Sequence, residues 1–198
     1  MSDQCETYIG DIPIDRSNYN ALQEAINEQN LDQVKRLLEI VRPYYRHVES
    51  LASIKDKEII KLVLNGYGSR GPYILISECL RKGNLELIKW LLEEYSFSGD
   101  NLVTLQIRAL YAKNVEAAEI LSKYGSKIDL DSNIIREISQ SGSIEVLKFL
   151  MDNYELKLED IDPISLACFF VDHLKEWILE KAPKVLDTIS NDKKVRDL

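Results

Sequence analysis

A glycine-rich hexapeptide, GYGSRG at residues 66–71, is the most direct chemical motif in the sequence. It matches the dinucleotide-binding pattern GxGxxG, in which backbone N–H groups and a helix N-terminus meet a pyrophosphate. That chemistry requires a strand directly before the loop, whereas the preceding segment, KEIIKLVLN, has the apolar spacing of a helix. We therefore expect Gly66 to end that helix in the left-handed conformation, Pro72 to begin the next helix, and no nucleotide to bind.

The other side chains capable of catalysis form no recognisable set. The two histidines, His47 and His173, lie far apart, and neither is near a cysteine or serine in a nucleophile context. We expect His47 to be solvated, in a loop or at a helix start, and His173 to lie on a polar face. Paired acids such as Glu93 and Glu94 are typical of solvated faces on an acidic chain. The sequence predicts no catalytic residues and no enzyme.

The three cysteines indicate neither a metal site nor a disulfide framework. Cys5, Cys79 and Cys168 are an odd number at wide spacing, without the CxxC pattern of a zinc site. Cys79 and Cys168 lie among apolar neighbours, so we expect small buried thiols in a reducing compartment. We predict no metal and no cofactor.

The charge and the hydropathy of the chain argue against two classes of partner, nucleic acids and membranes. Its net charge of −8, with a pI near 4.9, repels phosphate backbones. No apolar run approaches the roughly 20 residues that cross a bilayer, and the start MSDQCETYIG lacks the features of a signal peptide. We expect no nucleic acid or membrane partner and a cytoplasmic, intracellular location.

Aromatic and basic residues gather in two short segments, and these are the candidate binding residues. Tyrosine and arginine dominate binding hot spots because they offer large contact area, planar stacking and hydrogen bonds. The alternative is that some of these tyrosines only fill joints between structural units. The first segment holds Tyr44, Tyr45, Arg46 and His47, and the second holds Tyr67, Arg70 and Tyr73.

A recurring unit must position these segments. The stretch KGNLELIKWLLEEYS, residues 82–96, combines a glycine turn, a helix cap and an apolar stripe. Related patterns recur, with the cap falling at positions that are 26, 28, 30 and 29 residues apart. Such a period indicates one supersecondary unit stacked on its neighbours. The five predicted caps are Asn30, Asp56, Asn84, Asn114 and Ser143.

A second apolar segment precedes each cap, so each unit is a helix, a short turn and another helix. These first helices are predicted at NALQEAINE, VESLASIK, YILISECLRK, LQIRALYAK and IIREISQSG. A sixth, degenerate unit is predicted in DPISLACFFVDHLKEWILEKAP, where Asp162 can cap a helix that starts at Pro163. Equivalent positions of stacked units lie about 10 Å apart, so the two Tyr/Arg segments are expected to form one patch.

The second helices carry a resemblance to a known family. GNLELIKWLLEEY, GSIEVLKFLMD and NVEAAEILSKYGSKIDL resemble the ankyrin repeat, with residues 125–129 at its closing turn. The family's Thr-Pro-Leu-His motif is absent, and the period is shorter than its 33 residues. The resemblance implies an all-α solenoid of five to six stacked helix-turn-helix repeats with trimmed loops, similar to arrays of large DNA viruses and intracellular pathogens.

The expected organisation has three parts: a lead-in at 1–17, the repeat solenoid at 18–183 and a polar tail or cap at 184–198. The expected function is a non-enzymatic protein-protein interaction module, a monomer that binds another protein such as a host protein. Two alternatives stay open. One is a structural or self-assembling repeat protein, and the other, less favoured, is an enzyme with an unrecognised site.

Overall fold

The computed structural model describes residues 8–9, 12–13, 16–125, 128–139, 141–157 and 161 of the 198. The described residues are helical apart from turns, loops and one short strand pair, in which β1 (Tyr8–Ile9) runs antiparallel to β2 (Ile12–Pro13). The chain divides into two compact units, residues 1–78 and 79–198. The all-α prediction is confirmed.

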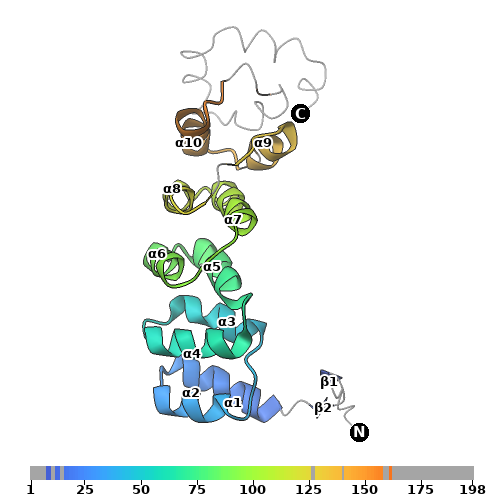
Figure 1. The fold of residues 1–198 in the computed structure, drawn as a ribbon, viewed down its shortest axis with the longest axis vertical. Coiled ribbons are helices and arrows are strands. Elements are labelled where there is room, and N and C mark those ends of the chain that lie inside the picture. The colour runs from blue at the N-terminus through green and yellow to red at the C-terminus, as the bar shows by residue number, and fades with distance from the viewer. Residues whose placement is uncertain are drawn as a thin grey trace. The chain divides into compact units, whose positions relative to one another are not determined.

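The first unit is a set of antiparallel helix pairs (Figure 1). Helices α1 and α2 contact each other, as do α3 and α4, and across the two pairs α1 contacts α3 while α2 contacts α4. First helices thus pack on first helices and second helices on second helices. The elements are α1 (Arg16–Asn27), α2 (Leu31–Leu38), α3 (Tyr45–Ser50), the 3₁₀ turn η1 (Leu51–Ser53), α4 (Lys57–Tyr67) and the start of α5 (Gly71–Lys82).

The second unit repeats this arrangement. Helices α6, α8 and α10 lie in one column of Figure 1, with α8 in contact with both of the others. Helix α7 contacts α8 within its pair and α9 in the following pair. After the end of α5, the elements are α6 (Leu85–Glu94), α7 (Gly99–Tyr111), α8 (Val115–Ser122), α9 (Ser132–Ser139) and α10 (Ile144–Tyr154).

The second helix of each pair starts at the cap predicted from the sequence. In each case the side-chain oxygen of the cap accepts a hydrogen bond from a backbone N–H in the first turn, which would otherwise lack a partner. The prediction of these helix starts is confirmed. The caps are Asn30, Asp56, Asn84, Asn114 and Ser143, with donor–acceptor distances between 2.8 and 3.4 Å.

Four of the five caps, all except Asp56, directly follow a residue with positive φ. The backbone N–H of Asn30 donates to the carbonyl of Ala25 at 2.9 Å, and the N–H of Asn114 donates to that of Ala109 at 2.8 Å. This six-residue closure is the Schellman ending, which needs a left-handed residue just before the cap. That residue is glycine in two turns but not in the others. The left-handed residues are Gln29, Gly83, Lys113 and Gly142, with φ between 54° and 71°.

The core follows the apolar stripes. In α6, Leu87, Ile88, Leu91 and Leu92 are buried, as the stripe predicted, and Cys79 is buried, also as predicted. Trp90 is half-buried and meets Tyr95 edge-on, with ring centroids 6.3 Å apart. Among the described residues, no helix has the length and apolar character needed to cross a membrane.

The first helix of each pair starts before the segment predicted for it, and the largest difference is in α7, which starts at Gly99 although LQIRALYAK begins at Leu105. Helix α1 starts at Arg16, inside the expected lead-in at 1–17, and α3 starts at Tyr45, three residues before the predicted VESLASIK segment. The predicted sixth unit, the tail at 184–198, Cys5, Cys168, His173 and Trp177 lie outside the described residues.

Candidate interaction surface

The first Tyr/Arg segment leads into α3, where it joins a buried part to an exposed one. Val41 and Pro43 are buried, whereas Tyr44 is 37% exposed and Tyr45 is 52% exposed. Arg46 is also exposed. Two aromatic side chains and one cation are therefore presented together at the start of a short helix.

His47 departs from the sequence-based expectation. We expected a solvated side chain, but its exposed fraction is 0%. The cause is that the ring packs between aromatic neighbours: it is parallel to the ring of Tyr19 in α1, with centroids 6.0 Å apart, and edge-on to that of Tyr44 at 4.5 Å. His47 therefore belongs to the packing of α1 on α3 and offers no surface to a partner.

Both ring nitrogens of His47 have backbone partners. The N–H of Tyr44 donates to Nδ1 at 3.1 Å, and Nε2 lies 3.0 Å from the carbonyl oxygen of Tyr19. An N–H can only donate and a carbonyl can only accept, so the ring is neutral and carries its proton on Nε2. At the third position of α3, His47 fills the role that Glu or Gln has in a capping box.

The second Tyr/Arg segment lies at the end of α4 and the start of α5. Tyr67 is the last residue of α4, exposed Arg70 lies in the turn, and Tyr73 is in the first turn of α5. Tyr67 and Tyr73 are half-buried. The two segments lie close together. Gly66 precedes Tyr67 and Pro43 precedes Tyr44, and a Cβ at position 66 would lie 3.0 Å from Cδ of Pro43.

The electrostatics of Tyr45 also connect the two segments. The Glu49 carboxylate, one helical turn further on, raises the pKa of the Tyr45 phenol, because a phenolate would lie beside a negative charge. Burial adds to this, and Glu78 and Tyr67 contribute smaller effects of the same sign. Tyr45 therefore keeps its proton and stays a hydrogen-bond donor at neutral pH.

The arginines of the two segments have free head groups. Within the described part of the chain, the guanidinium groups of Arg46 and Arg70 form no ion pair and no side-chain hydrogen bond. They can bind a partner without first breaking an internal contact.

The GYGSRG segment does not have the form of a nucleotide loop. Helix α4 precedes it, and each glycine has a local structural cause. Gly68, at φ 109°, ends α4, so the expectation that Gly66 takes the left-handed conformation is wrong. Gly66 lies within the helix against Pro43, and a Cβ at Gly71 would lie 2.9 Å from Cδ2 of Leu64. Pro72 is the second residue of α5, as expected within one position.

Sequence reasoning missed one member of this region, Tyr19. Its ring completes an aromatic cluster of Tyr19, Tyr44 and His47, with the Tyr19 and Tyr44 centroids 5.4 Å apart. A signal was present, because Tyr19 and His47 are 28 residues apart, within the spacing of the repeat. Residues at that separation are neighbours in successive units of a stacked array.

The described residues contain no group of three or more His, Cys, Asp or Glu side chains placed to hold a metal ion. No family model, no curated protein and no solved structure matches the chain. Inference about its function therefore rests on its own residues.

Proposed function

We propose that the protein is a non-enzymatic protein-protein interaction module, built as a divergent ankyrin-like solenoid. Support for the solenoid comes from the recurring cap, the recurring Schellman turn and the like-on-like helix contacts within each compact unit. Stacked arrays of this kind present extended surfaces to other proteins.

The binding surface in this proposal consists of Tyr44, Tyr45, Arg46, Tyr67, Arg70 and Tyr73, hereafter the Tyr/Arg surface. One observation carries it: Tyr45 is 52% exposed beside Arg46, and neither Arg46 nor Arg70 has an ion-pair partner in the described part of the chain. Tyrosine and arginine are enriched among the few residues that supply most of the binding energy at protein interfaces.

The partner in this proposal is another protein, bound by a monomer in the cytoplasm. The resemblance of the second helices to ankyrin arrays of viruses and intracellular pathogens extends the proposal to a host protein as the target. Nucleic acid is disfavoured as a partner because the net charge is −8.

Affinity purification followed by mass spectrometry would supply the partner, and the double variant Tyr45→Ala with Arg70→Ala would then test the surface. Each anchor typically contributes 2 kcal/mol or more, so we expect at least about thirtyfold weaker binding. The melting temperature should fall by no more than a few degrees, because the Tyr45 and Arg70 side chains are exposed.

A matched control is the double variant Tyr111→Ala with Arg136→Ala. Tyr111 is 51% exposed, close to the value for Tyr45, and Arg136 is exposed like Arg70. The control should bind normally. Normal binding by Tyr45→Ala with Arg70→Ala would refute the proposed surface, and unfolding of that variant would show that these side chains serve packing instead.

A further inference from the structure

The start of α3 depends on His47 for its cap. Tyr44 is the residue before the helix, and its side chain caps no backbone N–H. The N–H of Tyr44 is instead bound by Nδ1 of His47, and the helix itself is only six residues long. The buried ring therefore fixes the backbone from which Tyr44, Tyr45 and Arg46 project.

This arrangement tolerates only one protonation state. The lone pair of Nδ1 accepts from the Tyr44 N–H, while the Nε2 proton goes to the Tyr19 carbonyl. A second proton would have to bind at Nδ1, where it would point at another N–H. The Tyr44 N–H would then lose its acceptor, and a charged ring would stand in a site with no exposed surface.

Among the described residues, no carboxylate offsets that charge. On α3 itself, Glu49 is engaged with the phenol of Tyr45, and Arg46 carries a like charge. The pKa of His47 is lowered by burial and raised in part by the Tyr19 carbonyl, with no charged side chain among the causes. The charged residues of the two helices that pack on α3 are Arg16 and Glu24 of α1 and Lys57, Glu58 and Lys61 of α4.

We propose that His47 is a proton-sensitive latch: when its ring gains a second proton in mild acid, the start of α3 is released and the Tyr/Arg surface loses its shape. The consequence of this protonation for partner binding rests on the proposed function. His47 is then a positioning residue of that surface, acting through Tyr44 and without contact to the partner. Acidification would switch the surface off, and neutral pH would restore it.

The test uses the full chain with the substitution His173→Gln, which leaves His47 as the single histidine of the sequence. The imidazole is followed by NMR between pH 7.5 and 4.5, and the protection factor of the Tyr44 amide by hydrogen exchange over the same range. We expect a midpoint below 6.5, and a protection factor that falls about tenfold per pH unit between about 6.5 and that midpoint.

The sign follows from linkage. When the start of α3 is open, His47 binds the second proton at its ordinary pKa, whereas in the native form it binds that proton only at lower pH. The native start of α3 therefore has its full stability above about pH 6.5 and loses stability as the pH falls. Below the native midpoint both forms are protonated, and no further change is expected.

The conservative variant is His47→Gln. A glutamine can accept from the Tyr44 N–H with its oxygen and donate to the Tyr19 carbonyl with its amide, but it cannot titrate. Its Tyr44 protection should therefore be independent of pH. An equal pH dependence in His47→Gln would overturn the latch, and so would an imidazole midpoint near 6.5 with unchanged protection at Tyr44.

If His47→Gln does not fold, the NMR titration of the His173→Gln protein decides alone. The two proposals fail separately. If the Tyr44 amide responds to pH as expected but the double variant Tyr45→Ala with Arg70→Ala binds normally, only the binding surface is refuted. A surface that binds with no pH effect at Tyr44 would refute the latch only.

Discussion

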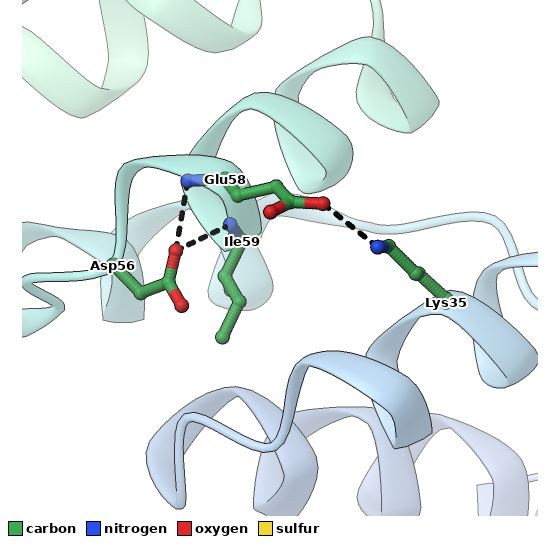
Figure 2. Close-up of polar contacts among 4 residues, drawn as sticks. All are labelled: Lys35, Asp56, Glu58 and Ile59. Atoms are coloured by element: carbon green, nitrogen blue, oxygen red, sulfur yellow. Dashed lines mark hydrogen bonds and ion pairs between the residues drawn. The ribbon is translucent and has the colours of Figure 1, made fainter.

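Asp56 and Glu58, two residues apart at the start of α4, use their carboxylates in opposite directions (Figure 2). Asp56 turns back onto its own helix and accepts from the backbone N–H groups of Glu58 at 2.8 Å and Ile59 at 3.2 Å. Glu58 reaches away from the helix to Nζ of Lys35 on α2, at 2.7 Å. One acid therefore caps a helix, and the other joins two repeats.

We expect the replacement of these two acids to lower the free energy of unfolding by different amounts. Asp56→Ala leaves two backbone donors in the first turn without their acceptor, so we expect a loss of about 1 kcal/mol in the free energy of unfolding. Glu58→Gln removes only an ion pair between exposed side chains, which water and salt screen, so the urea midpoint should hardly move. A larger loss of stability for Glu58→Gln than for Asp56→Ala in urea unfolding would show that the ion pair stabilises this junction more than the cap does.

The helix starts could be predicted because their cause is local in the sequence. Asn84 accepts from the backbone N–H of Leu87, three residues away, at 3.1 Å, and the glycine before it supplies the left-handed turn. The pattern of cap and apolar stripe holds this information within about ten residues. Recurrence of the pattern then predicted the pairing of helices.

The burial of His47 could not be predicted in the same way. Its cause is Tyr19, 28 residues away, and the local segment RPYYRH offers only polar and aromatic neighbours. Gly66 shows a related limit. Three glycines fall within the six residues of GYGSRG, and the local sequence does not show which of them ends the helix. In the structure Gly66 lies within α4 against Pro43, and Gly68, at φ 109°, follows the helix.

The second prediction concerns the core of α6. Leu91 is fully buried, so Leu91→Ala should cost about 2 to 5 kcal/mol in the free energy of unfolding, through lost burial and the cavity left behind. Trp90 lies next to it and is half-buried, so in a Trp177→Phe background the tryptophan fluorescence in urea reports the unfolding of this helix. Lys89→Ala, at an exposed position of the same helix, is the control and should change little. A loss below about 0.5 kcal/mol for Leu91→Ala would contradict the assignment of the buried face.

The third prediction concerns Gln106 in α7, whose side chain is an exception in the core. It is 1% exposed, and neither its Nε2 nor its Oε1 has a hydrogen-bond partner among the described residues. A buried amide without partners costs about 1 to 3 kcal/mol relative to water. Methionine has a similar length and no strong polar atom, so Gln106→Met should raise the free energy of unfolding by about 1 kcal/mol or more.

The control for Gln106→Met is Gln23→Met in α1. Gln23 is half-buried and donates to Oδ1 of Asn27 at 3.0 Å, so its replacement by methionine removes a bond and relieves no buried amide. We expect no gain in stability there. A loss of stability in Gln106→Met would mean that the Gln106 amide is hydrogen-bonded in solution, to an ordered water or to a bound group. Methionine cannot form such a bond, so the substitution would then remove a stabilising contact.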